Sequence, residues 1–389
     1  MGKLAIHGGN RVRKTFLPYG HQSIGKAEKT AIMKALDNDW LTQGYLVEKF
    51  EQNLCKYTGA SYAVVVSSGT AALHLAVLAL CNNKPQCIYT SPLSFVATSN
   101  SILYSGSDLQ FGDIDKHTLL LNPEPPQKCT GSIIVHYAGL PHNHEEWSSF
   151  KGWVLEDAAH SFGSERLIAN EWIRVGAQNT DSASIFSFHP VKTITTAEGG
   201  AVLTDNLALA EEIRSLRSHG ISRYPGTIAL HYEQRRLGFN YRLPDINCAL
   251  GIVQLHRLPG FVKKRRLLAE RYKQKLNGWE SLVLPNEPKG LKSCWHIYPI
   301  RLNLTKLSVS RDDVFEAMRA ENIGVQLHYI PIYRQPFYMK RFSFNCSDFP
   351  NTEDAYKRLL TLPLFPDMSF SDQDDVINAL DKVLSFFQL

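Results

Sequence analysis

The first hydrophobic pattern along the chain has the spacing of helices. Residues 23–37 are predicted to form a helix with alanine and leucine side chains near one face. Ser23, at its start, can cap this helix. Residues 45–57 continue with apolar side chains four positions apart, and Gly59 is suited to end that helix. We therefore expect two amphipathic helices near the start of the chain.

The pattern then changes to short apolar runs that are typical of buried strands. Residues 61–66 form a β-branched run bounded by polar residues, and they lead into the helix-forming stretch SSGTAALHLAVLAL. Further segments of this strand-like character occur at 87–90, 110–114, 132–137, 152–156, 183–187 and 200–204. Several are separated by helical stretches, so the alternation predicts an α/β protein with a mostly parallel sheet.

The character of the chain changes after about residue 255. The pattern predicts a long basic helix at 261–276, a strand at 296–302, a helix at 311–321, a strand at 324–327 and two closing helices. These elements indicate a smaller α+β domain at 256–389, behind a large domain at 1–255 that includes an N-terminal arm.

Composition and charge exclude several classes of protein. Of the 389 residues, 44% are hydrophobic and 20% are charged, which excludes a disordered chain. The net charge of +5 is small, requires no nucleic acid partner and suits an anionic small-molecule substrate. No apolar run approaches the ~18 residues of a membrane span, and the first residues lack a signal-peptide core, so we expect a cytoplasmic protein.

The seven cysteines are an odd number and none of them forms a C-x-x-C pair. This spacing in a long chain argues against a disulfide scaffold and against a zinc site. We therefore expect reduced, mostly buried thiols and no bound metal.

Lys192 is the first candidate for chemistry. It lies in SFHPVKTITTAEGG, residues 187–200, between two apolar strands and with few charged neighbours. Burial lowers the pKa of a lysine and favours the neutral amine that forms Schiff bases, although most lysines lie in surface loops.

Two further stretches add an acid and an anion site. Asp157 closes an apolar strand in VLEDAAHSFGS, where α/β proteins bind ligands, although aspartate there also commonly caps a helix. The stretch SSGTAALHLAV, residues 67–77, places hydroxyls and free N–H groups at a helix start, which can bind a phosphate or simply cap the helix. Together with Lys192, these features match the needs of pyridoxal 5′-phosphate.

The order of these motifs and their amino-acid sequences resemble those of the DegT/DnrJ/EryC1/StrS family of PLP-dependent sugar aminotransferases. The resemblance runs from about residue 17 to the end of the chain, and the set of motifs in this order is highly specific. The motifs are LPYGHQSI (17–24), WLTQG (40–44), SSGTAAL (67–73), SPLSFVATSN (91–100), EDAAHSFGS (156–164), SFHPVKTITTAEGG (187–200), RSHGI (217–221), GFNYRLPDINCALG (238–251) and HYIPIY (328–333). The family has PLP-dependent transferase fold type I, which is aspartate aminotransferase-like, so the resemblance implies this fold for the large domain.

The resemblance also implies roles for single residues. Lys192 matches the catalytic Schiff-base lysine, and Asp157 matches the aspartate on the pyridine nitrogen. His160 falls where the family contacts the phenolic oxygen of the cofactor, and Phe95 matches the aromatic residue stacked on its ring. The implied phosphate contacts are Ser68, Gly69 and Ser187.

Asn240 matches an asparagine that reaches the phosphate of a neighbouring subunit, which implies a homodimer with shared active sites. Within the family, FSFHPVKTITTAEGGAV and LHYIPIY look most like the transaminases of pseudaminic acid biosynthesis, and Tyr333 supports this branch. Such enzymes make UDP-4-amino-4,6-dideoxy-N-acetyl-β-L-altrosamine from L-glutamate and a UDP-4-keto-6-deoxy sugar. The similarity also implies that the substrate-binding residues are Tyr19, Trp40, Leu41, Thr42, Gln326, His328, Tyr329 and Tyr333.

Other readings stay open at this point. Another nucleotide-linked keto sugar is possible, as is a protein that binds PLP without catalysis. An NAD-dependent sugar dehydrogenase or epimerase would carry G-x-G-x-x-G after its first strand, and the chain has no such fingerprint. The residue that binds the donor carboxylate is open among Arg217, Arg236 and Arg242.

Overall fold

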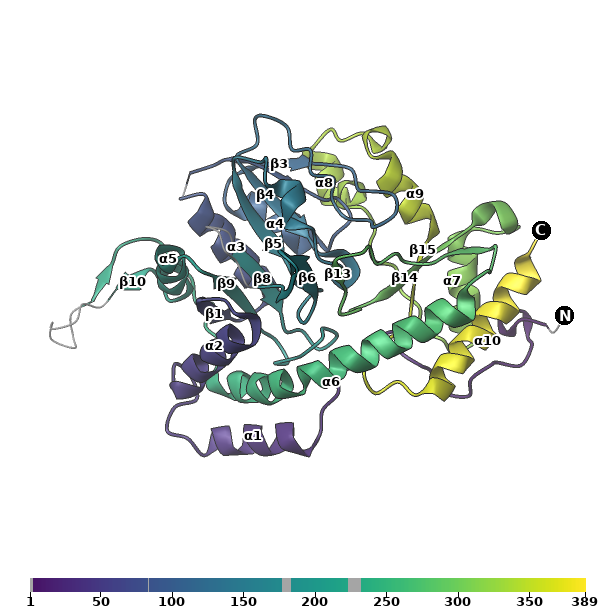
Figure 1. Cartoon of the computed structure of the whole chain (residues 1–389), viewed down its shortest axis with the longest axis horizontal. Helices are drawn as coiled ribbons and strands as arrows, with labels where there is room; N and C mark the ends of the chain where they lie inside the picture. Colours follow the sequence, from purple (N-terminus) through teal and green to yellow (C-terminus); the bar gives the residue numbers. More distant parts are fainter. Residues whose placement is uncertain (1–2, 83, 177–182, 223–231) are drawn as a thin grey trace.

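The computed structural model describes residues 3–82, 84–176, 183–222 and 232–389. A seven-stranded sheet lies at its centre, in the order β1-β9-β8-β5-β4-β2-β3 (Figure 1). β9 runs antiparallel to both β1 and β8, and the other neighbouring pairs are parallel. The strands are β1 (Tyr62–Val66), β2 (Cys87–Thr90), β3 (Asp108–Phe111), β4 (Gly131–Val135), β5 (Trp153–Asp157), β8 (Ala183–Ser187) and β9 (Gly200–Thr204). The predicted α/β fold with a mostly parallel sheet is confirmed.

Three of the predicted strands, β2, β8 and β9, have the expected bounds. The prediction at 110–114 extended too far, because Ile114 leaves the sheet and bridges Leu121 instead. A hairpin of β6 (Glu165–Ile168) and β7 (Glu171–Arg174) was not predicted. Its strands are rich in charged, partly exposed residues, so they lack the apolar run by which buried strands are found.

Helices cover both faces of the sheet. α3 (Gly69–Leu80), α4 (Val96–Tyr104) and α5 (Leu207–Arg217) share one buried cluster with side chains from one face. On the other face, α2 (Tyr45–Thr58) and the first half of α6 (Asp245–Leu276) pack on the remaining strand side chains. The result is a three-layer arrangement in which the strand ends, rather than the faces, are free to form a site.

α1 (Lys26–Leu36) packs against α6, and it begins three residues later than predicted. The prediction that Ser23 caps this helix is wrong, because the Ser23 hydroxyl donates a hydrogen bond of 2.8 Å to the Asp367 carboxylate. The predicted end of α2 is confirmed, since Gly59 adopts a left-handed φ of 93° and bonds back to the carbonyl of Cys55.

α6 connects the two regions of the chain and is twice as long as the predicted helix. In Figure 1 it runs from beside α2 to α10 (Phe370–Phe387). Its start is buried against the large sheet, whereas Leu268 and Tyr272 near its end belong to a second core with the C-terminal elements. The boundary at residue 255 falls inside this helix, so the division into domains at that point stays a prediction.

The second core is built around a small antiparallel sheet of β12 (Leu282–Val283), β14 (Tyr298–Leu302) and β15 (Leu359–Leu362). The strand predicted at 324–327 is wrong, since Ile323 and Gln326 form only isolated bridges, and β15 takes the third place in the sheet. The two predicted closing helices are found as α9 and α10, with β15 between them. The remaining elements are α7 (Arg311–Ala320), α8 (Pro336–Arg341), α9 (Pro350–Arg358), β10 (Ile221–Ser222), β11 (Glu233–Gln234) and β13 (Leu291–Lys292).

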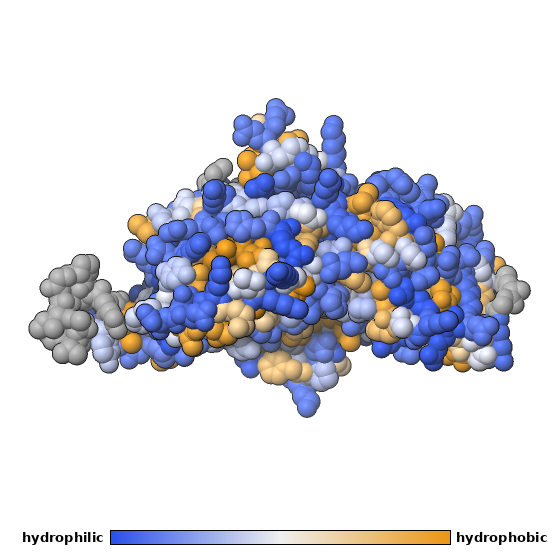
Figure 2. Space-filling model, turned by 90° about the horizontal axis from the view of Figure 1, so that it is seen from below, coloured by the Kyte–Doolittle hydropathy of each residue, from blue (hydrophilic) through white to orange (hydrophobic). Residues whose placement is uncertain are grey.

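The surface is mostly hydrophilic on the face seen from below α1 and α6, where hydrophobic areas are scattered between polar ones (Figure 2). Across the described ranges, no helix is both long enough and apolar enough to cross a bilayer.

Candidate active site

A cavity of about 500 Å³ opens at the carboxyl ends of the parallel strands. Its walls come from the starts of α3 and α4, the ends of β5 and β8, the loop after β8 and a segment of the C-terminal region around residue 328. Strand ends and helix starts meet at this edge because of the parallel topology. The cavity brings together many of the predicted site residues, namely Tyr19, Ser68, Gly69, Phe95, Asp157, His160, Ser187, Lys192, His328 and Tyr329.

Asp157 ends β5 and points its carboxylate into this cavity, while only 5% of the residue is exposed. One oxygen accepts a hydrogen bond of 2.6 Å from the Thr98 hydroxyl, and the other accepts one of 3.3 Å from the Ala159 N–H. Burial raises the pKa of Asp157, and the two hydrogen bonds and the Lys192 charge oppose this rise. The carboxylate is thus held in one orientation and is suited to a cationic partner.

Lys192 lies in the turn after β8, where its backbone N–H donates to the His189 carbonyl at 2.9 Å. Burial lowers its pKa to about 8, and the Asp157 carboxylate partly opposes this shift. Over the ranges that the structure describes, no hydrogen bond or ion pair engages the Nζ atom. A sizeable neutral fraction near physiological pH makes this amine a nucleophile and a proton carrier.

The start of α3 meets the end of β8 beside Lys192. Ser68 caps α3, because its Oγ accepts a hydrogen bond of 3.0 Å from the Ala71 N–H. At the next position, a Cβ atom on Gly69 would lie 2.8 Å from the Ser187 Cβ, so this close approach requires glycine. The cap and the anion-site interpretations are compatible, since the helix start presents N–H groups, a positive dipole end and the Ser187 hydroxyl to one place.

A group of neutral imidazoles forms another wall. The Tyr329 hydroxyl lies 3.0 Å from Nε2 of His160, and the rings of His160 and His296 are 4.4 Å apart. Burial lowers the pKa of His160 and His296 well below the usual range, and it lowers that of His328 to about 3. Nδ1 of His160 is buried without a hydrogen-bond partner in the described part of the chain, so it can accept or donate toward a ligand.

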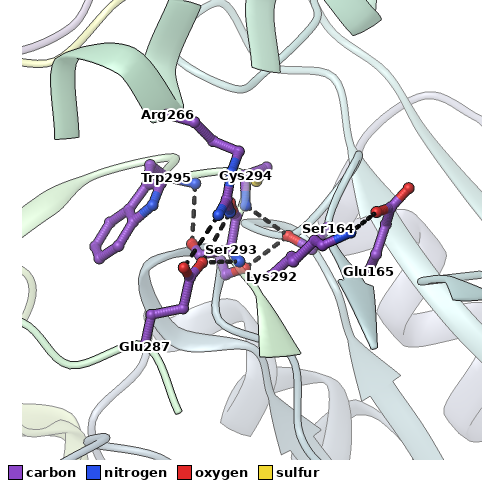
Figure 3. Close-up of polar contacts among 9 residues, drawn as sticks. Ser164, Glu165, Arg266, Glu287, Lys292, Ser293, Cys294 and Trp295 are labelled. Atoms are coloured by element: carbon purple, nitrogen blue, oxygen red, sulfur yellow. Dashed lines mark hydrogen bonds and ion pairs between the residues drawn. The ribbon is translucent and has the colours of Figure 1, made fainter. Parts of the chain in front are cut away.

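The loop after β5 is tied to the C-terminal region by a polar network (Figure 3). Ser164 accepts a hydrogen bond of 2.9 Å from the Cys294 N–H, and the Cys294 thiol donates one of 3.0 Å to the His160 carbonyl. The Glu287 carboxylate accepts from the Ser293 N–H and pairs with both terminal nitrogens of Arg266, at 2.6 to 3.1 Å. This network fixes the segment that carries His296 against the loop after β5, which carries His160.

Two predicted sugar-pocket residues lie outside the cavity. Tyr333 is buried in the core, where its hydroxyl donates a hydrogen bond of 2.8 Å to Glu353. Gln326 exchanges backbone hydrogen bonds with Thr361 beside the small sheet. Their predicted roles in substrate binding stay predictions, and any effect of Tyr333 on the pocket would act through packing.

The other distant residues are exposed at the surface. Trp40 is 65% exposed, and Leu41 and Thr42 follow it in the connection between α1 and α2. Asn240 is exposed and bridges Ser218. Phe95 borders the cavity but is still 58% exposed, so the mouth beside it is open in a single chain.

The three arginine candidates for the donor carboxylate lie outside this cavity. Arg217 pairs with Glu51 at 2.8 Å and also donates to a backbone carbonyl. Arg236 forms an ion pair with Glu212. Arg217 and Arg242 both border a separate hollow of about 300 Å³.

Thr98 and His296 are two polar residues of the cavity wall that were not predicted. Thr98 lies in the quoted motif SPLSFVATSN, but its contact with Asp157 joins positions 59 residues apart, and no local pattern marks it. His296 comes from the C-terminal region, and its position beside His160 depends on the network of Figure 3.

The fold and this cavity define a PLP-dependent aminotransferase of fold type I. The model of the DegT/DnrJ/EryC1/StrS aminotransferase family matches residues 22–381, so the chain belongs to this family. Its members depend on PLP, and this chain is a sugar aminotransferase. The NAD-dependent alternative is set aside by this match.

Known relatives resemble the chain over nearly its whole length. It is 37% identical to the uncharacterized protein MJ1066 of Methanocaldococcus jannaschii, over 96% of this chain and 99% of that protein. It is 35% identical to the spore coat polysaccharide biosynthesis protein SpsC of Bacillus subtilis, over 96% of this chain and 98% of that protein. Its structure resembles that of Helicobacter pylori PseC, an aminotransferase of pseudaminic acid biosynthesis, with a TM-score of 0.86 and 29% sequence identity. The match covers 96% of this chain and 100% of PseC.

The residues present fit pyridoxal 5′-phosphate. The α3 start with Ser68, Gly69 and Ser187 suits its phosphate. The Asp157 carboxylate offers a polar contact in the cavity, as does Nδ1 of His160, which has no partner among the described residues. Lys192 supplies an amine of lowered pKa between them. When bound, the cofactor supplies an electron sink for the carbon from which a proton is removed.

Proposed function

We propose that this aminotransferase moves an amino group from L-glutamate to C4 of a UDP-4-keto-6-deoxy-N-acetyl-hexose. The product would be UDP-4-amino-4,6-dideoxy-N-acetyl-β-L-altrosamine. The observation that carries the proposal is the cavity that joins Lys192, Asp157 and the α3 start, in a chain whose fold matches PseC over 96% of its length. The motif HYIPIY, whose His328 and Tyr329 border that cavity, supports the same branch.

In this proposal Lys192 is the catalytic residue. Its amine, with a pKa of about 8, can accept the α-proton of glutamate and return a proton during the transfer to the keto sugar. With the cofactor bound, Asp157 would hold an opposite charge against the pyridine nitrogen, and His160 would contact the phenolic oxygen. Phe95 would cover one face of the cofactor ring. The side-chain rings of Phe95 and Tyr329 have their centres 6.2 Å apart.

A second substrate is favoured by one comparison. SpsC is named for spore coat polysaccharide biosynthesis, and it is more similar in sequence, at 35% identity, than PseC is at 29%. An aminotransferase that acts on another nucleotide-linked keto sugar would use the same Lys192 and Asp157 chemistry. It would differ in the residues around the sugar, which lie at the open mouth beside Phe95.

We also propose that the enzyme is a cytoplasmic homodimer with shared active sites. Large apolar side chains lie exposed, including the predicted substrate residue Trp40 at 65% and, three positions before Asn240, Leu237 at 81%. Such exposure is typical of a surface that another subunit covers. A partner placed there could bring its Asn240 to the phosphate and close the mouth of the cavity.

The test is incubation of the holoenzyme with L-glutamate and single UDP-keto sugars. We expect 2-oxoglutarate to form, and NMR of the purified product to show a new amine at C4 with the altro configuration. If only a different nucleotide-linked keto sugar is aminated, that sugar is the substrate and the UDP-4-keto-6-deoxy-N-acetyl-hexose is not. No amination of any nucleotide-linked keto sugar would contradict both.

A further inference from the structure

Two cysteine thiols face each other at the end of the sheet that the active site does not use. Cys87 begins β2, and Cys129 lies two residues before β4. Their Sγ atoms are 2.9 Å apart, although the residues are separated by 42 positions in the chain. A disulfide bond needs an S–S distance of about 2.05 Å, so the sulfur atoms have to approach by only about 0.9 Å.

The backbone around both residues holds the thiols in this position. The N–H of Thr130 donates to the Cys87 carbonyl at 3.0 Å, which fixes the chain beside Cys129 to the start of β2. The side-chain oxygen of Gln86 accepts two hydrogen bonds of 2.9 Å, from the Thr130 hydroxyl and the Trp153 indole. The two strands therefore bring the sulfur atoms together regardless of side-chain motion elsewhere.

The two thiols differ in their access to solvent. Cys87 is half-buried, whereas Cys129 is 5% exposed and lies in an apolar cluster with Tyr89 and Trp147. Burial and the neighbouring thiol raise the pKa of Cys129 to about 12. An oxidant in solution therefore meets Cys87 first, and Cys129 lies where it can attack Cys87 from inside the protein.

We propose that Cys87 and Cys129 form a reversible disulfide when the protein meets a small-molecule disulfide of the glutathione type. The Cys87 thiolate attacks one sulfur of the oxidant, which gives a mixed disulfide and releases one reduced thiol. Cys129 then attacks the Cys87 sulfur and gives its proton to the departing small-molecule thiolate, which leaves as the second reduced thiol. Two protein thiols are oxidised by two electrons, and one small-molecule disulfide is reduced to two thiols.

The bond would stabilise the fold without touching the catalytic site. Both cysteines lie at the amino ends of β2 and β4, whereas the cavity lies at the carboxyl ends of the strands. The closed loop holds α4 and β3, which the reduced protein keeps in place only by packing and hydrogen bonds. Closing a loop of this length restricts the unfolded chain, so we expect the melting temperature to rise by about 2–5 °C.

The experiment treats the folded protein with oxidised glutathione and maps its tryptic peptides without reduction. The exposed Cys346 is replaced by serine in all samples, so that a reactive surface thiol does not confuse the result. We expect the peptide that starts at Cys129, after cleavage at Lys128, to be joined to the peptide that contains Cys87. Dithiothreitol should separate them and reverse the rise in melting temperature.

Two variants make the proposal falsifiable at each step. Cys129→Ala should stop the reaction at glutathione bound to Cys87, and Cys87→Ala should leave Cys129 unmodified. The proposal is overturned if the parent protein keeps glutathione on Cys87 without the Cys129 link. Failure of both thiols to react under the same conditions would overturn it as well. None of these readouts depends on aminotransferase activity.

Discussion

The cofactor side of the cavity and its open mouth differ in how much of the site one chain supplies. Asp157 ends β5, where it is buried and accepts a hydrogen bond from Thr98, while Ser187 ends β8 and Lys192 lies in the turn that follows. At the mouth, Phe95 is 58% exposed, and Asn240 lies on the surface away from the cavity.

This difference separates two levels of specificity. The buried side holds the groups that PLP chemistry needs, and the family match covers it. The open mouth beside Phe95 holds the residues that would determine sugar specificity. In our proposal a second subunit completes it. The predictions below test the two sides separately.

The largest effect is expected from Lys192→Ala. Removing the amine takes away both the covalent attachment and the proton carrier, so turnover should fall by ~10³-fold or more. Formation of 2-oxoglutarate from glutamate measures this loss. Lys84→Ala, which changes an exposed lysine, is the matched control and should behave as the parent. If Lys192→Ala forms 2-oxoglutarate at the parent rate, Lys192 is not the catalytic residue.

Asp157→Asn should separate cofactor binding from catalysis. The amide keeps the shape of the side chain but not its charge, so PLP should stay bound while turnover falls by about 10²-fold or more. Absorbance of the bound cofactor and steady-state rates give the two quantities. The exposed Asp108→Asn should change neither. Near-parent turnover in Asp157→Asn would leave this residue with only a structural role.

The open side is tested by subunit mixing. In an equimolar mixture of Lys192→Ala and Asn240→Ala chains, half the dimers are mixed, and each mixed dimer holds one intact site if sites are shared. Activity should therefore recover to about a quarter of that of the parent, above either variant alone. If mixing restores nothing while mass spectrometry shows mixed dimers, Asn240 does not act across the interface.

A smaller effect is expected from Thr98→Val. This change removes the hydroxyl that donates to Asp157 at 2.6 Å and that lowers the pKa of this carboxyl. Loss of one such hydrogen bond, about 1 kcal/mol, should lower turnover roughly 5-fold. Because the pKa of Asp157 then rises, the acid limb of the pH–rate profile should move to higher pH. An unmoved acid limb would show that Thr98 does not tune Asp157.

Much of the buried side could be predicted from the sequence, because its signals are local. Asp157 and Lys192 lie directly beside apolar strands, and the α3 start carries Ser68 and Gly69 in sequence order. Thr98 and His296 could not be found in this way, since each reaches the site through contacts between distant segments.

The fold shows the same limit. The helix expected at 261–276 begins after Pro259 and Gly260, whereas α6 starts at Asp245, continues through both residues and packs at its two ends against different cores. The strand expected at 324–327 has a suitable sequence, but β15 pairs with β14 in its place. Which of two apolar segments joins a sheet is decided by the tertiary arrangement.

The most direct test of the central claim is reduction of the holoenzyme with borohydride followed by peptide mapping. Borohydride fixes the cofactor to the amine that holds it. We expect a single peptide that contains Lys192 to carry the added mass. The label should be lost when excess L-glutamate is added before reduction. A label on a different lysine, or no label on a protein that shows activity, would contradict the mechanism.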